Sequence, residues 1–234
     1  MKFSFKHYNN IDQAYFRTDF HMHSNWTDGK QTIAEMVDQA KKISLTDIAI
    51  TDHIREKSTY FTKYYKEILD IRRDENINIF IGYESKVKNF LGEIDVSEEV
   101  KNKAEVRIVS VHNFPIGRKL ISPKIFNIKT CQDIELELSI AAINNRSNEF
   151  DIIGHPGGMS IKFHGEFPLD YFKEIIIGCS KEGIAFDINH AYHYSIINQI
   201  KSLLTKYNPL VSIGSDAHIS GKVGSWISDR NEYL

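Results

Sequence analysis

The sequence predicts an α/β protein whose parallel strands form a barrel and carry a site at their carboxyl ends. Short apolar, β-branched runs alternate with helix-like stretches about seven times along the 234 residues, as in parallel sheets with helices outside. The proportions of hydrophobic residues (41%) and charged residues (26%) are those of an ordinary globular chain. A closed or nearly closed barrel is favoured, and an open doubly wound sheet is the alternative because periodicity alone does not reveal closure.

The predicted strands are bounded by polar residues, Gly or Pro. They cover residues 16–23, 47–53, 78–87, 106–114, 151–156, 184–189 and 210–215. The predicted helices lie between them, at residues 32–43, 60–73, 132–145, 169–179 and 195–207. The first helix has a clear start, because Thr32 can cap it while Glu35, three residues on, completes a capping box. No long linker or internal repeat divides the chain, so we expect one domain over residues 1–234, with residues 1–18 as an N-terminal extension.

Charge and cysteine content exclude several classes of protein. The formal net charge of −2 does not fit a strongly basic surface for nucleic acid. With only Cys131 and Cys179, the chain fits a reducing cytosol better than a disulfide scaffold, and both thiols are interpreted as buried and inert. No apolar stretch approaches the roughly 18–20 residues of a membrane helix, and the first ten residues lack the hydrophobic core of a signal peptide. We therefore expect a cytoplasmic protein with no membrane partner.

Metal-binding side chains follow the predicted strands at their outgoing ends. Eight of them fall at six strand ends: His21, His23, His53, Glu84, His112, His155, Asp216 and His218. The carboxyl ends of parallel strands meet at one rim, and residues i and i+2 of a strand point the same way, so His21 and His23 can converge on one ion. A single histidine is more often a core or loop residue than a ligand. Collecting this many ionisable groups without a metal would, however, cost several kcal/mol for each buried charge. Imidazole and carboxylate without thiolate suit a catalytic zinc, manganese or iron site.

Seven segments, in order, carry a family resemblance: DFHMHSNWTDG, ITDH, GYESKVKNFLGEID, VSVHNF, IGHPGG, FDIN and GSDAH. Together they resemble the polymerase-and-histidinol-phosphatase (PHP) superfamily of metal-dependent phosphoesterases, from about Asp19 to Trp226. Residues 82–95 are most similar to the stand-alone phosphatase branch with three metals. The resemblance implies a distorted (β/α)7 TIM-like barrel and three divalent metal ions. Zinc is the favoured metal, with manganese or iron as alternatives. Asp187 departs from the pattern, which commonly has Glu before Ile-Asn.

Residue by residue, the resemblance implies three metal sites. The first ion would be held by His21, His23, Glu84 and Asp216. Glu84 would bridge to a second ion held by His112 and His155, and a third would be held by Asp28, His53 and His218. Some three-metal relatives have histidine in place of Asp28. A pair of ions can generate hydroxide near neutral pH and stabilise the attacking and leaving oxygens, so no covalent nucleophile is required. The residues assigned to catalysis are Glu84, Asp216 and His218.

The substrate phosphate also needs cationic or hydrogen-bonding partners. The candidates near the strand ends are Arg55, Lys86, Arg118, Lys119, His190 and His193. Each of the four Lys and Arg side chains can equally be an ordinary solvated loop charge, and the two histidines can equally lie on the surface.

The sequence alone leaves three functions open. The first is a phosphatase of a small phosphorylated metabolite, with histidinol phosphate as the family's best-known stand-alone substrate. The second is a nucleotide or nucleic-acid phosphoesterase or exonuclease, against which the balanced charge counts modestly. The third is a non-catalytic metal-binding module in regulation or assembly, which gives no physical reason to keep so many mutually repelling ligands. The sequence specifies neither the substrate nor the oligomeric state.

Overall fold

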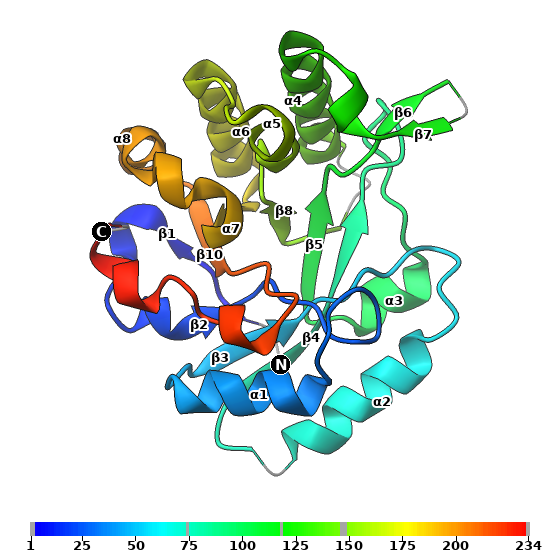
Figure 1. Cartoon of the computed structure of the whole chain (residues 1–234), viewed down its shortest axis with the longest axis vertical. Helices are drawn as coiled ribbons and strands as arrows, with labels where there is room; N and C mark the ends of the chain where they lie inside the picture. Colours follow the sequence, from blue (N-terminus) through cyan, green and yellow to red (C-terminus); the bar gives the residue numbers. More distant parts are fainter. Residues whose placement is uncertain (1–2, 74, 118, 146–148, 233–234) are drawn as a thin grey trace.

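A computed structural model describes residues 3–73, 75–117, 119–145 and 149–232. The strands of its main sheet are β1 (Lys6–His7), β2 (Thr18–Asp19), β3 (Asp47–Ile50), β4 (Asn78–Lys86), β5 (Val106–Ser110), β8 (Ile152–Gly154), β9 (Ala185–Asn189) and β10 (Leu210–Gly214). Within the described ranges, seven of these strands run parallel in the order β2-β3-β4-β5-β8-β9-β10, and β1 pairs antiparallel with β10. The helices lie outside the curled sheet, as Figure 1 shows.

The two edges of the parallel sheet come together, because the residues that follow β2 pair with β10 and with the residues that follow it. The backbone N–H of Phe20 donates to the carbonyl of Ile213 (3.0 Å), and the N–H of Asp216 donates to the carbonyl of His21 (2.8 Å). A parallel bridge then joins Met22 to Ala217. The sheet therefore forms a distorted TIM-like barrel, which confirms the closed or nearly closed barrel predicted from the sequence.

Helices cover the outside of the barrel. They are α1 (Ile33–Lys42), α2 (Phe61–Arg72), α3 (Glu98–Lys103), α4 (Ile128–Asn144), α5 (Gly158–His164), α6 (Leu169–Glu182), α7 (His190–His193) and α8 (Ile197–Tyr207). The predicted capping box of α1 is present: Glu35 N donates to Thr32 Oγ1 at 3.3 Å, and Thr32 N donates to Glu35 Oε2 at 2.8 Å. Within the described chain, no helix combines the length and apolar character needed to cross a membrane.

Three predicted boundaries were wrong. Helix α4 begins at Ile128, not at residue 132, because Asn127 caps it by accepting a hydrogen bond from Thr130 N at 2.9 Å. The predicted strand 106–114 ends at Ser110, and the chain continues into a hairpin of β6 (Phe114–Ile116) and β7 (Lys119–Ile121). The first predicted strand, 16–23, contains only the short β2, because a 3₁₀ turn occupies Tyr15–Arg17.

The N-terminal extension covers the end of the barrel at which the strands begin. The barrel interior there is an apolar cluster of Phe20, Ala49, Phe80, Val106, Ile108, Ile152 and Ala185. Phe3 and Phe5 pack against this cluster, and the ring centroids of Phe3 and Phe20 are 4.3 Å apart. Aromatic side chains thus fill one end of the barrel, and the polar site described below lies at the other.

Candidate metal centre

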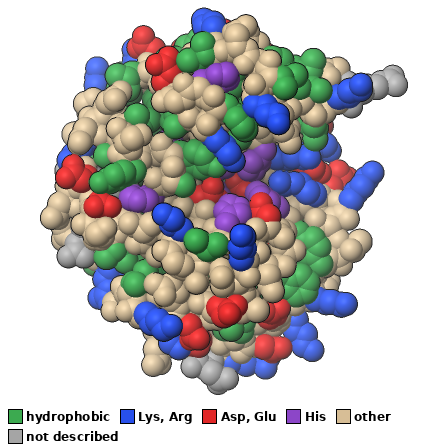
Figure 2. Space-filling model, viewed as in Figure 1, with side chains coloured by type: hydrophobic (Ala, Val, Ile, Leu, Met, Phe, Trp, Pro, Cys, Tyr) green, Lys and Arg blue, Asp and Glu red, His purple; other side chains and the backbone are tan. Residues whose placement is uncertain are grey.

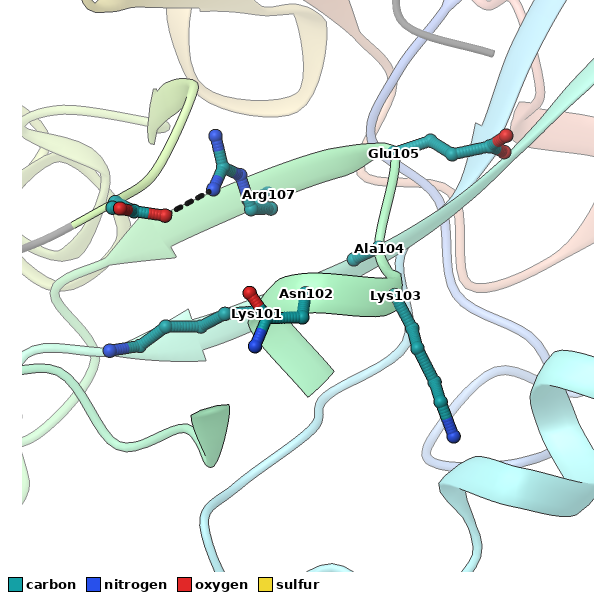
Figure 3. A pocket seen from close by; sticks show the side chains of 7 residues that line it. Lys101, Asn102, Lys103, Ala104, Glu105 and Arg107 are labelled. Carbon is teal, nitrogen blue, oxygen red and sulfur yellow. Dashed lines mark hydrogen bonds and ion pairs between the residues drawn. The ribbon is translucent and has the colours of Figure 1, made fainter. Parts of the chain in front are cut away.

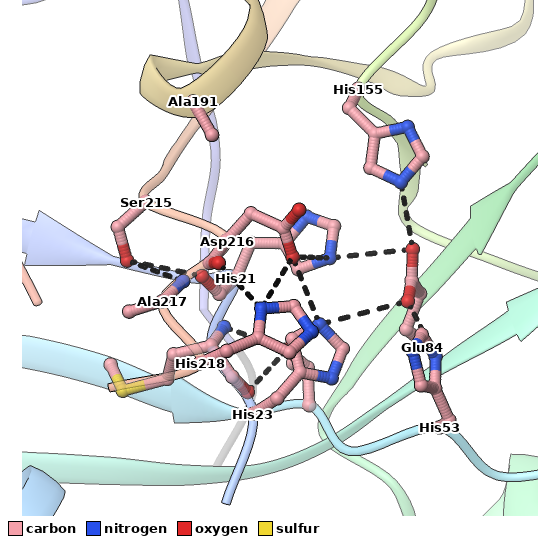
Figure 4. A network of polar contacts seen from close by, with 12 residues as sticks. His21, His23, His53, Glu84, His155, Ala191, Ser215, Asp216, Ala217 and His218 are labelled. Carbon is pink, nitrogen blue, oxygen red and sulfur yellow. Dashed lines mark hydrogen bonds and ion pairs between the residues drawn. The ribbon is translucent and has the colours of Figure 1, made fainter. Parts of the chain in front are cut away.

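Glu84 lies at the centre of a cluster of histidines at the carboxyl ends of the strands. The Glu84 side chain is 1% exposed, and its Oε1 lies 3.1 Å from His155 Nε2, 3.3 Å from His112 Nε2 and 3.4 Å from His21 Nε2. Its other oxygen, Oε2, lies 2.8 Å from His53 Nδ1. The two carboxylate oxygens therefore face different sets of imidazoles, and Figure 4 shows Glu84 between His155 and His53.

Asp216 and His23 extend the cluster toward the last strand. His23 Nε2 lies 3.1 Å from Asp216 Oδ1 and 3.7 Å from Glu84 Oε2. His21 Nε2 lies 3.6 Å from the same Asp216 oxygen. His21 and His23, two residues apart, thus face the same carboxylates, as the alternation of side chains along an extended segment requires.

Asp28 gathers a further group at the exposed edge of the cluster. Its Oδ2 lies 3.3 Å from both His53 Nε2 and His218 Nε2, and its Oδ1 lies 3.9 Å from His23 Nδ1. His218 Nδ1 donates to the backbone carbonyl of Asp216 at 2.9 Å, which leaves the lone pair of Nε2 facing Asp28. Ligand atoms within 4.8 Å of one another form four overlapping groups: His23, Asp28, His53 and His218; His21, Glu84 and His155; His21, His23 and Asp216; and His53, Glu84 and His112.

Buried atoms without hydrogen bonds show that this donor set fits metal ions. Among the residues that the structure describes, His21 Nε2, both ring nitrogens of His23 and Glu84 Oε2 are buried and form no hydrogen bond. Buried polar atoms normally find a partner, because leaving them unpaired costs about 1–3 kcal/mol each. A divalent ion would satisfy the nitrogen lone pairs and the carboxylate oxygen together. The set also contains only nitrogen and oxygen donors, which suits zinc, manganese or iron.

Electrostatics keep the central carboxylate ionised. Burial opposes the charge on Glu84, but the imidazoles of His112, His21 and His53 outweigh this effect and hold its pKa well below the usual range. Burial lowers the pKa of His112 to about 4, although the Glu84 carboxylate raises it. His112 and Glu84 are thus in the protonation state in which both groups bind cations. At His53 the carboxylates of Glu84 and Asp28 outweigh burial and raise the pKa to about 9.

Asp187, at the middle of β9, accepts hydrogen bonds that position residues of the cluster. Its Oδ2 accepts hydrogen bonds from His21 Nδ1 (2.9 Å), His155 N (3.1 Å) and Asn189 Nδ2 (3.0 Å). Because Nδ1 of His21 donates to Asp187, the lone pair of Nε2 faces Glu84 and Asp216. This pairing of a carboxylate with a histidine is typical of the groups that orient metal ligands. The sequence marked Asp187 only as a departure from the family pattern, since no local signal places it beside His21.

Glycines and strained backbone give the ligands room. A Cβ at Gly214 would lie 2.5 Å from His21 Cβ, and one at Gly154 would lie 2.1 Å from Ser110 Oγ. His155 and Asp216 themselves have φ angles of 30° and 52°, which residues with a Cβ rarely adopt. Such backbone strain is concentrated at functional sites, where the surrounding structure maintains it.

The loop that carries Asp28 is held by the buried Asp52. Asp52 Oδ1 accepts from Ser24 N (3.0 Å) and Thr27 Oγ1 (2.6 Å), and Oδ2 accepts from Ser24 Oγ (2.7 Å). Asp52 immediately precedes His53, so one strand end contributes a candidate ligand and also positions the loop that carries another, Asp28.

Comparison with known proteins agrees with this geometry. The model of the PHP domain family matches residues 19–231. The chain belongs to the PHP domain family. A "Probable phosphatase" of Caldicellulosiruptor saccharolyticus is 31% identical over 202 residues, covering 80% of this chain and 73% of the relative. One from Caldicellulosiruptor bescii is 29% identical over 203 residues, covering 82% and 75%. A histidinol phosphate phosphatase from Lactococcus lactis, solved with zinc, L-histidinol and phosphate, has the same fold, with a TM-score of 0.72, 18% identity and 92% coverage of each chain.

The cationic candidates for the phosphate lie around this PHP cluster in different settings. Arg55 Nη1 donates to the backbone carbonyl of Glu84 at 2.8 Å, so its guanidinium lies directly beside the cluster. Lys86 Nζ lies 3.4 Å from Asp95 Oδ2. Lys119 lies in β7 and is exposed. Arg118 lies outside the described residues. Their role in binding phosphate stays a prediction.

The prediction that His193 is a partner of the substrate phosphate was wrong. His193 is fully buried; its Nδ1 accepts from Asn189 N (3.1 Å) and its Nε2 donates to the carbonyl of Pro156 (2.8 Å). Burial lowers its pKa to about 4, so it is a neutral link between β9 and the turn after His155. His190 is partly buried, with its ring 4.9 Å from that of Tyr194, and its role stays a prediction.

Tyr192 is a site residue that sequence reasoning missed. Its ring centroid lies 5.0 Å from that of His155. Burial, together with the carboxylates of Asp216 and Glu84, raises the pKa of its hydroxyl, which therefore stays protonated. The sequence holds no signal for this role, because a tyrosine in a short helix is more often a packing residue.

Proposed function

We propose that this PHP protein is a metal-dependent phosphatase of small phosphomonoesters, similar in its chemistry to histidinol phosphatases. The family match and the probable phosphatases among its relatives support this activity class. The observation that carries the proposal is the ionised Glu84, whose Oε1 faces His21, His112 and His155 and whose Oε2 faces His23 and His53. Among the described residues, His21 Nε2 and both ring nitrogens of His23 are buried and form no hydrogen bond.

Three ions fit the proposed ligand sets. The first set is His21, His23, Glu84 and Asp216; the second is Glu84, His112 and His155; the third is Asp28, His53 and His218. Zinc is favoured, with manganese or iron as alternatives, because the donors are imidazole and carboxylate. Zinc is also the metal in the Lactococcus lactis structure. When bound, such ions activate water and neutralise the charge on phosphoryl oxygens.

The residues of the chain divide this work between a buried side and an open edge. His21, His23, His155 and Glu84 are at most 2% exposed and would anchor ions. His53, His112, His218 and Asp28 have side chains 22–53% exposed, so they border the space where a substrate would enter. Figure 2 shows histidine and acidic side chains at the floor of a hollow, with Lys and Arg around it.

At the open edge, Asp216 and His218 have the catalytic roles in this proposal. Their side chains are 9% and 36% exposed, so both can contact a phosphate ester beside the buried ligands. Arg55 lies next to the same edge, where its charge can stabilise a phosphate dianion. The ring of Tyr192 lies beside that of His155, and its protonated hydroxyl, which interacts with Asp216, adds a neutral donor.

The proposed enzyme acts as a single domain in the cytoplasm on a small phosphorylated metabolite. Cys131 and Cys179 are both free and buried, which fits a reducing compartment. Burial raises the pKa of both thiols, which argues against a cysteine nucleophile. The two alternatives, a nucleic-acid phosphoesterase and a non-catalytic metal-binding module, are not favoured: the net charge is −2, and the ligand cluster has both a buried and an open side.

Turnover of p-nitrophenyl phosphate by the full chain tests the proposal. We expect phosphate release that a chelator abolishes and that zinc or manganese restores, with about three ions per chain by elemental analysis. Glu84→Gln should lose metal and activity together, whereas the matched control Glu35→Gln, at the start of α1, should keep both. A fully metallated protein that hydrolyses no phosphomonoester would show the proposal to be wrong.

A further inference from the structure

A cavity with cationic walls lies beside the metal centre. It has a volume of about 280 Å³ and lies between the end of β4 and the β6–β7 hairpin. Its walls include Lys86, Lys88, Asp95, Pro115, Lys119 and Leu120, and we call it the lysine pocket. Pro115 and Leu120 supply apolar surface, so the pocket combines charge with a wall that could contact a carbon chain.

The lysine pocket has an excess of positive charge. Lys86 Nζ lies 3.4 Å from Asp95 Oδ2, and Lys88 Nζ lies 3.2 Å from Glu56 Oε2. Lys119 forms no ion pair with any residue that the structure describes. Partly exposed ion pairs of this kind contribute little energy, so the ammonium groups can turn toward an incoming anion.

The lysine pocket lies close to Glu84, where the proposed reaction takes place. Lys86 follows Glu84 by two residues on β4, and β6 begins two residues after His112. At about 3.3 Å per residue, the Cα of Lys86 lies about 7 Å from that of Glu84 along the strand. Figure 2 shows basic side chains next to the histidines on the side of the hollow toward β6 and β7. An anion in the pocket and a phosphate at Glu84 would therefore be separated by about the length of a small metabolite.

We propose that the lysine pocket binds a second anionic group of the substrate, so that the preferred substrates are phosphomonoesters with another phosphate or a carboxylate several bonds away. This inference rests on the proposed phosphatase activity and names its substrate class. Lys119 supplies the uncompensated charge, and Lys86 and Lys88 exchange their carboxylate partners for the substrate anion. An ester with a cationic ammonium at the same distance is a poor substrate, because it meets like charges.

A larger hollow lies far from the candidate ligands. It has a volume of about 480 Å³ and lies at the start of β5, where Arg107 Nη1 is 3.4 Å from Glu149 Oε2. Figure 3 shows the side chains that line it. It lies at the opposite end of β5 from His112, and its lysines and arginine are mixed with Glu105 and Glu149. The lysine pocket is thus the cationic cavity that shares the rim with the candidate metal ligands.

Four esters of one chain length test the proposal with the metal-loaded full chain. They are butyl phosphate, 4-aminobutyl phosphate, 4-phosphooxybutanoate and 1,4-butanediol bisphosphate. We expect kcat/KM for the two bis-anionic esters to exceed that for butyl phosphate by about 10-fold or more, because each charge-assisted hydrogen bond contributes on that scale. The aminobutyl ester should be the slowest. Comparison of kcat/KM for 4-phosphooxybutanoate and 1,4-butanediol bisphosphate shows whether the pocket prefers a carboxylate or a phosphate.

Charge removal in the pocket separates this inference from the phosphatase proposal. Lys119→Gln should reduce the ratio of kcat/KM between bis-anionic and butyl esters about 10-fold, and Lys88→Gln should act in the same direction. The matched control Lys181→Gln, exposed near the end of α6, should leave the ratio unchanged. Equal kcat/KM for all four esters, or an unchanged ratio in both pocket variants, would overturn the second-anion site while leaving the phosphatase intact. Absence of turnover with every ester would overturn both.

Discussion

Replacing Asp187 by Asn should weaken metal binding without changing the shape of the site. Asp187 is fully buried, and its Oδ2 accepts from His21 Nδ1, His155 N and Asn189 Nδ2. An amide oxygen can still accept these bonds, but the NH2 group would then occupy the place of Oδ1, which has no hydrogen-bond partner among the described residues. Leaving that donor unpaired costs about 1–3 kcal/mol of the free energy of unfolding.

A second effect concerns the metal ion that His21 is proposed to hold. Loss of the negative charge behind a ligating histidine lowers its basicity and loosens its orientation, which reduces metal affinity about 10- to 100-fold. This corresponds to about 1.4–2.7 kcal/mol of binding free energy. Competition with a chromophoric chelator measures the affinity, and kcat/KM at saturating zinc measures how much of the loss persists once the ions are bound.

Asp151→Asn is the matched control at the other end of the barrel. Asp151 accepts from Arg107 Nε and Nη2, both at 3.0 Å, so this change removes a partly buried ion pair far from the ligands. We expect it to lower the free energy of unfolding while metal affinity stays at the wild-type value. If Asp187→Asn also binds zinc with wild-type affinity and keeps wild-type kcat/KM, then Asp187 does not orient His21 and the reasoning is refuted.

Four further predictions concern metal, stability and the hydroxyl over the site. Chelation should lower Tm and zinc should restore it, since a ligand at about 100 times its Kd stabilises the native state by about 2.7 kcal/mol; equal Tm values would argue against bound metal. Burial shifts the pKa of His193 from 6.5 to about 4, so the unfolded chain binds a proton that the native state does not, and stability falls as pH drops through this window. The His193→Gln variant should lack this pH-dependent part of the free energy of unfolding, at most about 3 kcal/mol, in urea unfolding curves recorded across the pH range. If variant and wild type show the same pH dependence, His193 is not the group whose pKa is lowered. Thr32→Ala should cost about 0.5–2 kcal/mol with unchanged kcat/KM, because it removes only the cap of α1. Tyr192→Phe should lower kcat/KM about 10-fold at unchanged metal content; a loss of metal would show instead that the ring contact with His155 depends on the hydroxyl.

The clustering of the candidate ligands was predictable from the sequence because strand direction determines where strand ends lie. His112 and His155 each follow a short apolar run, and the parallel order of β5 and β8 places both beside Glu84. Local chemistry also predicted the start of α1, since Thr32 and Glu35 interact with each other's backbone.

Other features depend on contacts between distant segments and escaped prediction. His193 was expected to contact the substrate phosphate, but α7 turns its ring inward onto the carbonyl of Pro156. Asp187 lies 166 residues from His21 in sequence, so no local pattern reports their hydrogen bond. Val109 and Val111 stand on either side of Ser110, so the β-branched pattern of residues 106–114 gives no sign that β5 ends at Ser110.

The aromatic residues that precede the family match have a practical consequence for shortened versions of the protein. A fragment trimmed to residues 19–231 would lose Phe3, Phe5 and β1. The rings of Phe20 and Phe80 would then be exposed to water at the end of the barrel where the strands begin. The last strand, β10, would also lose its antiparallel neighbour. Unpaired strand edges beside exposed aromatic rings promote self-association. Boundaries drawn from homology alone would therefore yield an aggregating fragment that still contains every proposed ligand.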